Sequence, residues 1–170
     1  MRILVVEDDV ALRELLAHIL RNQREGVEVL EAGNLDDAGK LLPRADAVLC
    51  DGSFPTHPGT RPEFVSVCDS NWARVRLECE RLKIPFVMLS GNKTLVNRLN
   101  DVGTLAFAKP DQVLDSVRSV VVLGASIESV HQAEDLRKIE EAETAELPVA
   151  VEQQRPQPEP RAWWRDIYRR

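Results

Sequence analysis

The chain has 170 residues, 44% of them hydrophobic and 29% charged, which suits one globular domain with an appendage. A formal net charge of -6 at pH 7 argues against a nucleic-acid-binding body, and the apolar runs are too short for a transmembrane helix. The N-terminus lacks the pattern of a signal peptide, and the three cysteines have no metal-ligand spacing. We therefore expect a cytoplasmic protein with reduced thiols.

The N-terminal third begins with a strand and a helix. Residues 3–6 form a continuous apolar run with β-branched members, which is typical of a strand buried on both faces of a parallel sheet. The run ends in the acidic pair Glu7-Asp8, and residues 10–22 then carry leucines and isoleucine at the spacing of an amphipathic helix. Residues 27–31 are apolar but interrupted by charge, which predicts an edge strand.

The next segment contains a second helix and a third strand. Asn34 can cap a short helix that Pro43 terminates. Residues 47–50 are apolar and bounded by turn signals, which indicates a buried strand with Asp51 at its carboxyl end. Residues 54–62 hold three prolines and a glycine, and we expect a loop there.

The second half of the domain repeats the alternation. We expect a helix from about residue 63 to 82, a strand over 86–89 that ends at Ser90, and a short helix through 95–99. A fifth strand over 105–108 ends at Lys109-Pro110, and an apolar helical pattern follows it. Strands that alternate with helices predict an α/β fold, a doubly wound five-stranded parallel sheet with helices on both faces.

The composition changes after about residue 124. Residues 124–147 form an acidic extension in which a helix with a weak apolar stripe of Ile127, Val130 and Ile139 could contact a partner. A solvated helix or disorder is an equally open alternative, and residues 148–161 form a proline-rich linker. Residues 162–170 combine tryptophan, tyrosine and arginine in an aromatic and basic tail. This tail could dock on residues 1–123 of the same chain, bind a downstream protein, lie on an anionic membrane, which is the weaker alternative, or have no structure.

Chemically active residues stand at the ends of the predicted core strands. In a doubly wound sheet these ends share one rim, which brings together the residues Glu7, Asp8, Asp51, Ser90 and Lys109. Clustered carboxylates repel one another, and Mg²⁺ would relieve that repulsion while keeping several of its waters. A carboxylate in such a pocket can attack phosphorus and form an aspartyl-phosphate, with Lys109 neutralising charge and Ser90 donating a hydrogen bond.

At this point residues 1–123 resemble the CheY-like receiver domain of two-component response regulators. The matching motifs are Ile3-Leu4-Val5-Val6-Glu7-Asp8-Asp9, Asp51 followed by Pro55, Leu89-Ser90-Gly91 and Lys109-Pro110. The resemblance implies a flavodoxin-like strand order of 2-1-3-4-5. It also implies that Asp51 takes a phosphoryl group from a sensor histidine kinase or a phosphotransfer protein.

The resemblance further implies a role for each pocket residue. Asp8 would ligate Mg²⁺ directly and Glu7 mainly through water, while Asp51 and the backbone carbonyl of Ser53 would supply further oxygens. Ser90 would be the hydroxyl that moves onto the phosphoryl group, and Lys109 its ion-pair partner.

Several positions depart from the receiver pattern. The stretch from Asp51 to Ser90 is long and the stretch from Ser90 to Lys109 is short. Ala106 stands where the family has its switch aromatic, and Phe107, one step along the strand, would face the opposite side. We also expect no DNA-binding output domain.

The sequence therefore predicts a phosphoacceptor response regulator, a phosphoprotein rather than a turnover enzyme, that signals through protein contacts. The alternative is a pseudo-receiver, a scaffold module whose phosphoryl switch is uncoupled or lost. Homodimerisation stays open. A dehalogenase-type phosphatase would need an acid at Ser53, and a dinucleotide enzyme would need a glycine-rich turn at Glu7-Asp8, so both fit poorly.

Overall fold

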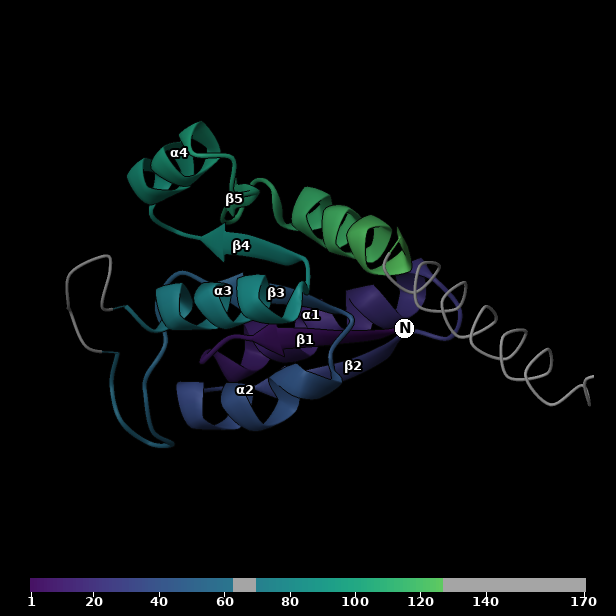
Figure 1. Ribbon diagram of the computed structural model, residues 1–170, viewed down its shortest axis with the longest axis horizontal. Helices are drawn as coiled ribbons and strands as arrows, with labels where there is room; N and C mark the ends of the chain where they lie inside the picture. Colours follow the sequence, from purple (N-terminus) through teal and green to yellow (C-terminus); the bar gives the residue numbers. More distant parts are fainter. Residues whose placement is uncertain (63–69, 127–170) are drawn as a thin grey trace, which may run out of the picture. The chain divides into compact units, whose positions relative to one another are not determined.

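The computed structural model describes residues 1–62 and 70–126, so the predictions for residues 63–69 and for 127–170 lie outside the described parts (Figure 1). Strands and helices alternate along the chain as the sequence predicts. The elements are β1 (Arg2–Val6), α1 (Val10–Gln23), β2 (Glu28–Ala32), α2 (Leu35–Leu41), the 3-10 turn η1 (Leu42–Arg44), β3 (Ala47–Asp51), α3 (Asn71–Leu82), β4 (Phe86–Ser90), α4 (Lys93–Asp101) and β5 (Ala106–Ala108). A further helix covers residues 113–126.

The strands form one parallel sheet in the order β2-β1-β3-β4-β5, which confirms the predicted fold class and strand order. The register places Val6 opposite Cys50, Asp51 opposite Leu89, and Ser90 opposite Ala108. The strands therefore end almost level with one another, and the residues that follow them gather at one rim of the sheet.

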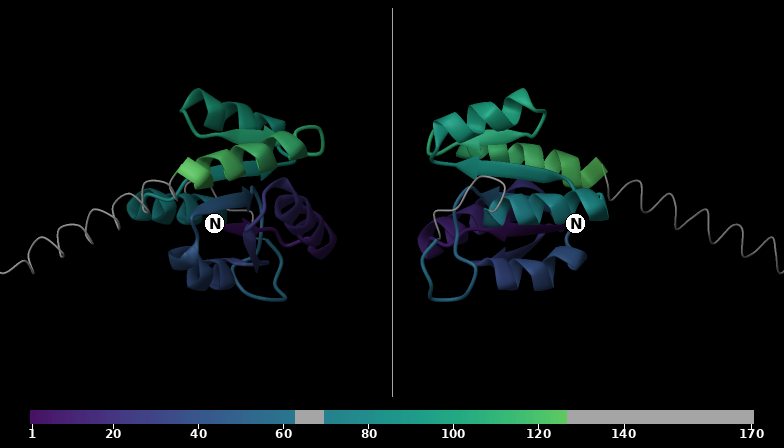
Figure 2. Two further views of the ribbon diagram at one scale, coloured as in Figure 1. Left: turned by 90° about the vertical axis from the view of Figure 1, so that its right-hand side faces the viewer. Right: turned by 60° about the vertical axis from the view of Figure 1, so that its left-hand side comes forward.

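The sheet lies between two layers of helices (Figure 2). Side chains alternate along each strand, so each face of the sheet builds its own core. The face toward α2, α3 and α4 includes Leu4, Val48, Met88, Trp72 and Val96, and the face toward α1 and the helix over 113–126 includes Ile3, Leu49, Val87, Leu16 and Val117. Burying an aliphatic side chain such as Leu4 or Leu49 contributes roughly 1.5–3 kcal/mol, which explains why the central strands carry almost no polar residue.

Short polar side chains fix where the helices begin. Asp9 accepts a hydrogen bond from Leu12 N at 3.0 Å at the start of α1, and Asn92 accepts one from Leu95 N at 3.1 Å at the start of α4. Asn34 accepts from Asp37 N at 2.9 Å, which confirms the cap predicted for α2. Each cap satisfies a backbone donor that the first helical turn leaves unpaired.

The loop after β3 is anchored in a way that its sequence did not indicate. Leu35 N and Asp36 N, in the first turn of α2, donate to the carbonyls of Pro55 and Thr56 at 3.0 and 3.2 Å. Asn71 Nδ2, at the start of α3, donates to the Phe54 carbonyl at 2.8 Å. Of the helix predicted over 63–82, the structure describes α3 from Asn71 onward, after a bend at Ser70.

The outer edge of β5 is closed by side chains rather than by another strand. Asn100 Oδ1 accepts from Ala106 N at 2.9 Å, and Asn100 Nδ2 donates to the Ala106 carbonyl at 3.0 Å. Gln112 Oε1 accepts from Ala108 N at 2.8 Å, and Gln112 N donates to the Ala108 carbonyl at 2.9 Å. The backbone N–H and C=O groups of Ala106 and Ala108 are thus hydrogen-bonded without any contribution from β4.

Candidate functional site

The predicted pocket residues meet at the carboxyl rim of the sheet. Glu7 follows β1, Asp51 ends β3, Ser90 ends β4 and Lys109 follows β5. Lys109 Nζ donates to Glu7 Oε2 at 2.6 Å and to Asp51 Oδ1 at 2.8 Å, so one ammonium bridges two carboxylates. Glu7 and Asp51 are only 3% and 9% exposed, which makes this a buried charge cluster.

Backbone contacts hold Glu7 and the loop behind it. Glu7 Oε1 accepts from Asp9 N at 3.4 Å, and the Glu7 carbonyl accepts from Arg13 Nη1 at 2.6 Å. Gly33 lies close to this arginine, since a Cβ at residue 33 would stand 3.1 Å from Arg13 Nη1. Sequence reasoning missed Arg13, because no local motif marks an arginine that bonds to a carbonyl near the pocket.

Burial shifts the protonation of the cluster. Burial, reinforced by the charge of Asp51, raises the pKa of Glu7 to about 7, and Lys109 only partly opposes this. Burial also raises the pKa of Asp51 above its ordinary value, although Lys109 and the backbone N–H groups of Gly52 and Ser53 act in the opposite direction. Burial lowers the pKa of Lys109, but Asp51 and Glu7 outweigh that effect and leave it above its ordinary value.

The carboxylates fit a hard divalent cation. Glu7, Asp8 and Asp51 each offer an oxygen, and these oxygens lie within 4.8 Å of one another. Asp8 is more exposed than the other two carboxylates, so the cluster opens to solvent on its side. An all-oxygen donor set with one open side is what Mg²⁺ prefers, because it retains several waters. The position of the Ser53 carbonyl as a further ligand stays a prediction.

Ser90 is buried at the end of β4, and its hydroxyl oxygen accepts a hydrogen bond from the start of α4. Its Oγ accepts a hydrogen bond from Asn92 N at 3.2 Å, and the residue is 4% exposed. Asn92 also caps α4, so Ser90 is tied to the first turn of that helix.

Ala106 and Phe107 lie on opposite faces of β5. Ala106 belongs to the core toward α4, and Phe107 packs against the core toward α1 and the helix over 113–126. A hollow of about 370 Å³ lies between α4 and the end of β5, lined by Val96, Ala108 and Gln112 among others. The side chain of Phe107 therefore lies on the face of β5 that points away from α4.

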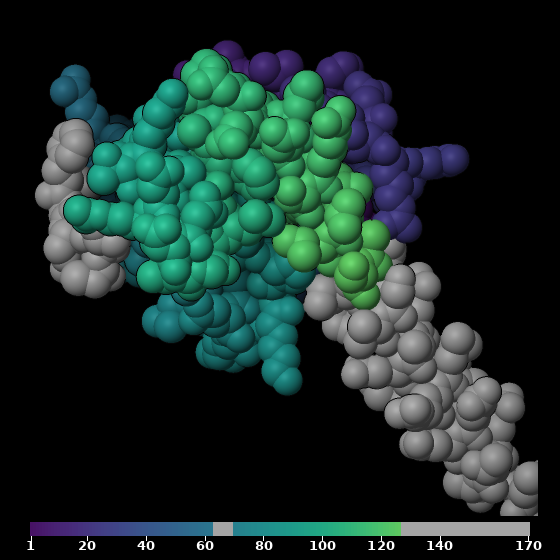
Figure 3. All heavy atoms as spheres, turned by 90° about the horizontal axis from the view of Figure 1, so that it is seen from above, coloured from purple at the N-terminus to yellow at the C-terminus, as the bar shows by residue number. Residues whose placement is uncertain are grey.

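Figure 3 looks onto the surface formed by α4, β5 and the helix over 113–126. Exposed apolar side chains occur on these elements and the turn between them, namely Val102, Leu105, Leu114 and Val122. Apolar surface of this kind is a common feature of protein contact sites, although single exposed side chains are ordinary.

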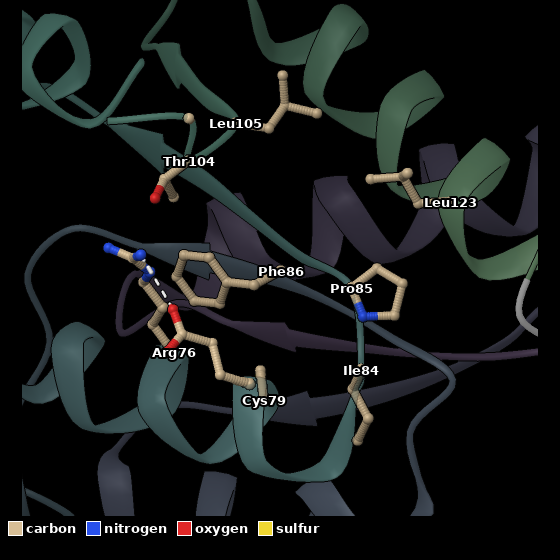
Figure 4. A pocket seen from close by; sticks show the side chains of 10 residues that line it. Arg76, Cys79, Ile84, Pro85, Phe86, Thr104, Leu105 and Leu123 are labelled. Atoms are coloured by element: carbon tan, nitrogen blue, oxygen red, sulfur yellow. Dashed lines mark ion pairs between the residues drawn. The ribbon is translucent and has the colours of Figure 1, made fainter. Parts of the chain in front are cut away.

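A separate hollow lies at the opposite, amino end of the sheet (Figure 4). It measures about 400 Å³ and is lined by Phe86 and Pro85 of the sheet edge and by Leu123. Arg76 and Glu80 of α3 form an ion pair of 3.0 Å at its side. It contains none of the predicted pocket residues, so it is not part of the acidic site.

No family model and no curated protein matches the sequence. Among solved structures, the chain is similar to a CheY-like receiver domain from Methanospirillum hungatei JF-1, with 19% identity and a TM-score of 0.56 over 75% of this chain and 96% of that one. A proposed response regulator from Chloroflexus aurantiacus J-10-fl matches with 26% identity and a TM-score of 0.53, over 73% of this chain and 97% of that one. A response regulator from Burkholderia pseudomallei, solved with a phosphorylated aspartic acid, a calcium ion and citrate, matches with 20% identity and a TM-score of 0.51, over 78% and 74%.

The chain thus has the receiver fold of response regulators, and the resemblance inferred from its motifs is confirmed. The similar structures are described as response regulators or their receiver domains. Within the described residues, no helix has the length and apolar character needed to cross a bilayer.

Proposed function

We propose that this protein is a phosphoacceptor response regulator that receives a phosphoryl group on Asp51. The observation that carries the proposal is the bridging of Asp51 and Glu7 by Lys109 at the end of β3. The ammonium of Lys109 opposes the effect of burial on the pKa of Asp51, which favours the ionised, nucleophilic carboxylate, and it limits repulsion toward an anionic donor.

In the transfer step, an oxygen of Asp51 attacks phosphorus and forms an O–P bond. The P–N bond of a donor phosphohistidine breaks, and its electron pair returns to the imidazole nitrogen. Lys109 neutralises charge on the phosphoryl oxygens, and the Ser90 hydroxyl, 4% exposed at the end of β4, turns to donate a hydrogen bond to one of them.

Glu7, Asp8, Asp51 and the backbone carbonyl of Ser53 would hold Mg²⁺. When bound, the cation supplies further neutralisation of charge on the transferring group. The Burkholderia structure with its phosphorylated aspartic acid and calcium ion supports this assignment by analogy of fold.

The donor is a sensor histidine kinase or a phosphotransfer protein, and the output is a protein contact rather than DNA binding. The domain assignment proposed with this function is a receiver over residues 1–123, an acidic extension over 124–147, a linker over 148–161 and a contact tail over 162–170.

A pseudo-receiver is the second candidate, and the small Ala106 favours it. With Ala106 on the α4 face of β5 and Phe107 on the other face, β5 offers no aromatic side chain on the α4 side that phosphorylation could move. Amide hydrogen exchange over residues 92–112, with and without phosphorylation, separates the two candidates. A pseudo-receiver shows the same exchange in both states.

The direct test is incubation of the full chain with acetyl phosphate and Mg²⁺, followed by intact mass measurement. We expect one added phosphoryl group that hydroxylamine removes, and none in Asp51→Asn. The matched control is Asp115→Asn, an exposed acid on the helix over 113–126, which should be phosphorylated like the wild type. A wild-type chain without the adduct, or an adduct that persists in Asp51→Asn, contradicts the proposal.

A further inference from the structure

We propose that Gly52 is a positioning residue for Ser90. The space left by its missing side chain holds the Ser90 hydroxyl in a resting position on the backbone N–H of Asn92, at the start of α4. The inference rests on the proposed function for its consequence, because release of that hydroxyl matters only if Asp51 is phosphorylated.

Packing, not backbone conformation, explains the glycine at residue 52. Its φ lies outside the left-handed range, so another residue could adopt this backbone without strain. A Cβ at this position, however, would stand 2.9 Å from Ser90 Cβ and would overlap Ser90 Oγ. It would also contact Leu95 Cδ2 at 3.5 Å, an ordinary van der Waals distance. The steric conflict is therefore specific to Ser90.

Ser90 in this position links two chemically different regions. Its Oγ accepts from Asn92 N at 3.2 Å, and Asn92 Oδ1 accepts from Leu95 N at 3.1 Å. Gly52 follows Asp51 directly, so one chain of contacts joins the phosphoacceptor to the first turn of α4. When rotation about the Ser90 Cα–Cβ bond carries Oγ toward a phosphoryl group, the Asn92 N–H loses its acceptor, and the start of α4 loosens.

The loop offers a matched control one residue from Ser90. A Cβ at Gly91 would meet no atom within 4 Å, and its φ also lies outside the left-handed range. Gly91→Ala therefore tests the effect of an added methyl group in the same turn without the steric conflict.

The experiment measures amide hydrogen exchange of the full chain, first without phosphodonor. We expect Gly52→Ala to make the Asn92 amide exchange about tenfold faster, the size expected for one lost hydrogen bond, and Gly91→Ala to leave it unchanged. In a Ser90→Gly background, Gly52→Ala should add nothing. Unchanged Asn92 exchange in Gly52→Ala, or an effect that persists in the Ser90→Gly background, overturns the inference.

A folding failure is also informative. If Gly52→Ala does not fold, the double variant with Ser90→Gly should fold, since it removes the overlapping atoms. A double variant that also fails to fold shows that Gly52 serves some other contact and overturns the inference.

Phosphorylation with acetyl phosphate and Mg²⁺ then separates this inference from the proposed function. Phosphorylation should make the Asn92 amide of the wild type exchange faster, and it should produce no further increase in Gly52→Ala. A purely structural role of Gly52 would not produce this difference between the two proteins. A wild type that takes no phosphoryl group refutes the proposed function but leaves the first measurement valid. A phosphorylated wild type with unchanged Asn92 exchange refutes the coupling alone.

Discussion

The polar side chains of the acidic pocket and those beside β5 have different roles. We call the second region, which consists of α4, β5 and Gln112, the α4–β5 flank. In the pocket, Lys109 joins two buried carboxylates, so charged groups that would repel are kept together. Along the flank, Asn100 and Gln112 bond to the backbone of β5, so neutral amides complete a strand edge. The first region concentrates charge for chemistry, whereas the second stabilises the surface next to it.

In this chain the pocket residues follow the receiver pattern more closely than the neighbouring strand β5 does. The acids, hydroxyl and lysine stand at strand ends as in the receiver motif, while Ala106 replaces the aromatic of that motif on the α4 side. Between the pocket and the start of α4, the side chain of Ser90 is hydrogen-bonded to Asn92 N.

The largest expected effect comes from removing the bridging charge with Lys109→Met. Two buried carboxylates would lose their counter-charge, so we expect a loss of about 3 kcal/mol in the free energy of unfolding and on the order of 100-fold in phosphorylation rate. Urea denaturation and phosphodonor kinetics measure these losses. Lys93→Met is the control, because Lys93 and Asp111 are exposed and 3.5 Å apart, and it should resemble the wild type. Equal stability of the two variants would show that the pocket does not depend on Lys109.

The next effect is a pH dependence centred on Glu7. Its pKa rises from 4.5 to about 7 on folding, so the folded chain binds this proton more tightly than the unfolded chain does. Without metal, Glu7 therefore contributes stability that is fully present below pH 4.5 and is lost as the pH rises through about 7. Mg²⁺ binding competes with the same proton, so its affinity should fall about tenfold per pH unit below neutrality.

Chemical denaturation of the metal-free chain and Mg²⁺ titrations across this range measure both trends. Glu7→Gln should flatten the stability profile between pH 4.5 and about 7. A slope that survives in Glu7→Gln would assign the titration to another group.

The smallest effect concerns the flank. Asn100→Leu leaves the N–H and C=O of Ala106 without partners, and we expect a loss of about 1 kcal/mol in the free energy of unfolding. Asn97→Leu, on the same helix, should change stability less. Phosphorylation of Asp51 should be unaffected in both variants. A phosphorylation defect in Asn100→Leu would mean that pocket and flank are not separate.

Local sequence patterns predicted the sheet and the pocket because both depend on simple periodicity. Apolar runs such as residues 3–6 and 86–89 identified the buried strands, and parallel strands bring their carboxyl ends to one rim. Glu7, Asp51, Ser90 and Lys109 were therefore found from their positions alone, and Asn34 from its cap position.

Long-range contacts between side chains and backbone were not predictable in this way. Nothing local to Asn100 or Gln112 indicates that they close β5, and Pro55 gives no sign that its carbonyl receives an α2 donor. Nothing local to Gly52 indicates its closeness to Ser90, because that closeness depends on β3 and β4 being neighbours.

The closed edge of β5 has a consequence for how copies of this chain can meet. An open edge strand is a template on which a foreign segment can add a strand, whether as a peptide ligand or in an aggregate. Here the amide of Asn100 imitates the backbone of a neighbouring strand, and Gln112 completes the imitation at Ala108. Fibril growth from this edge would first require both residues to release β5.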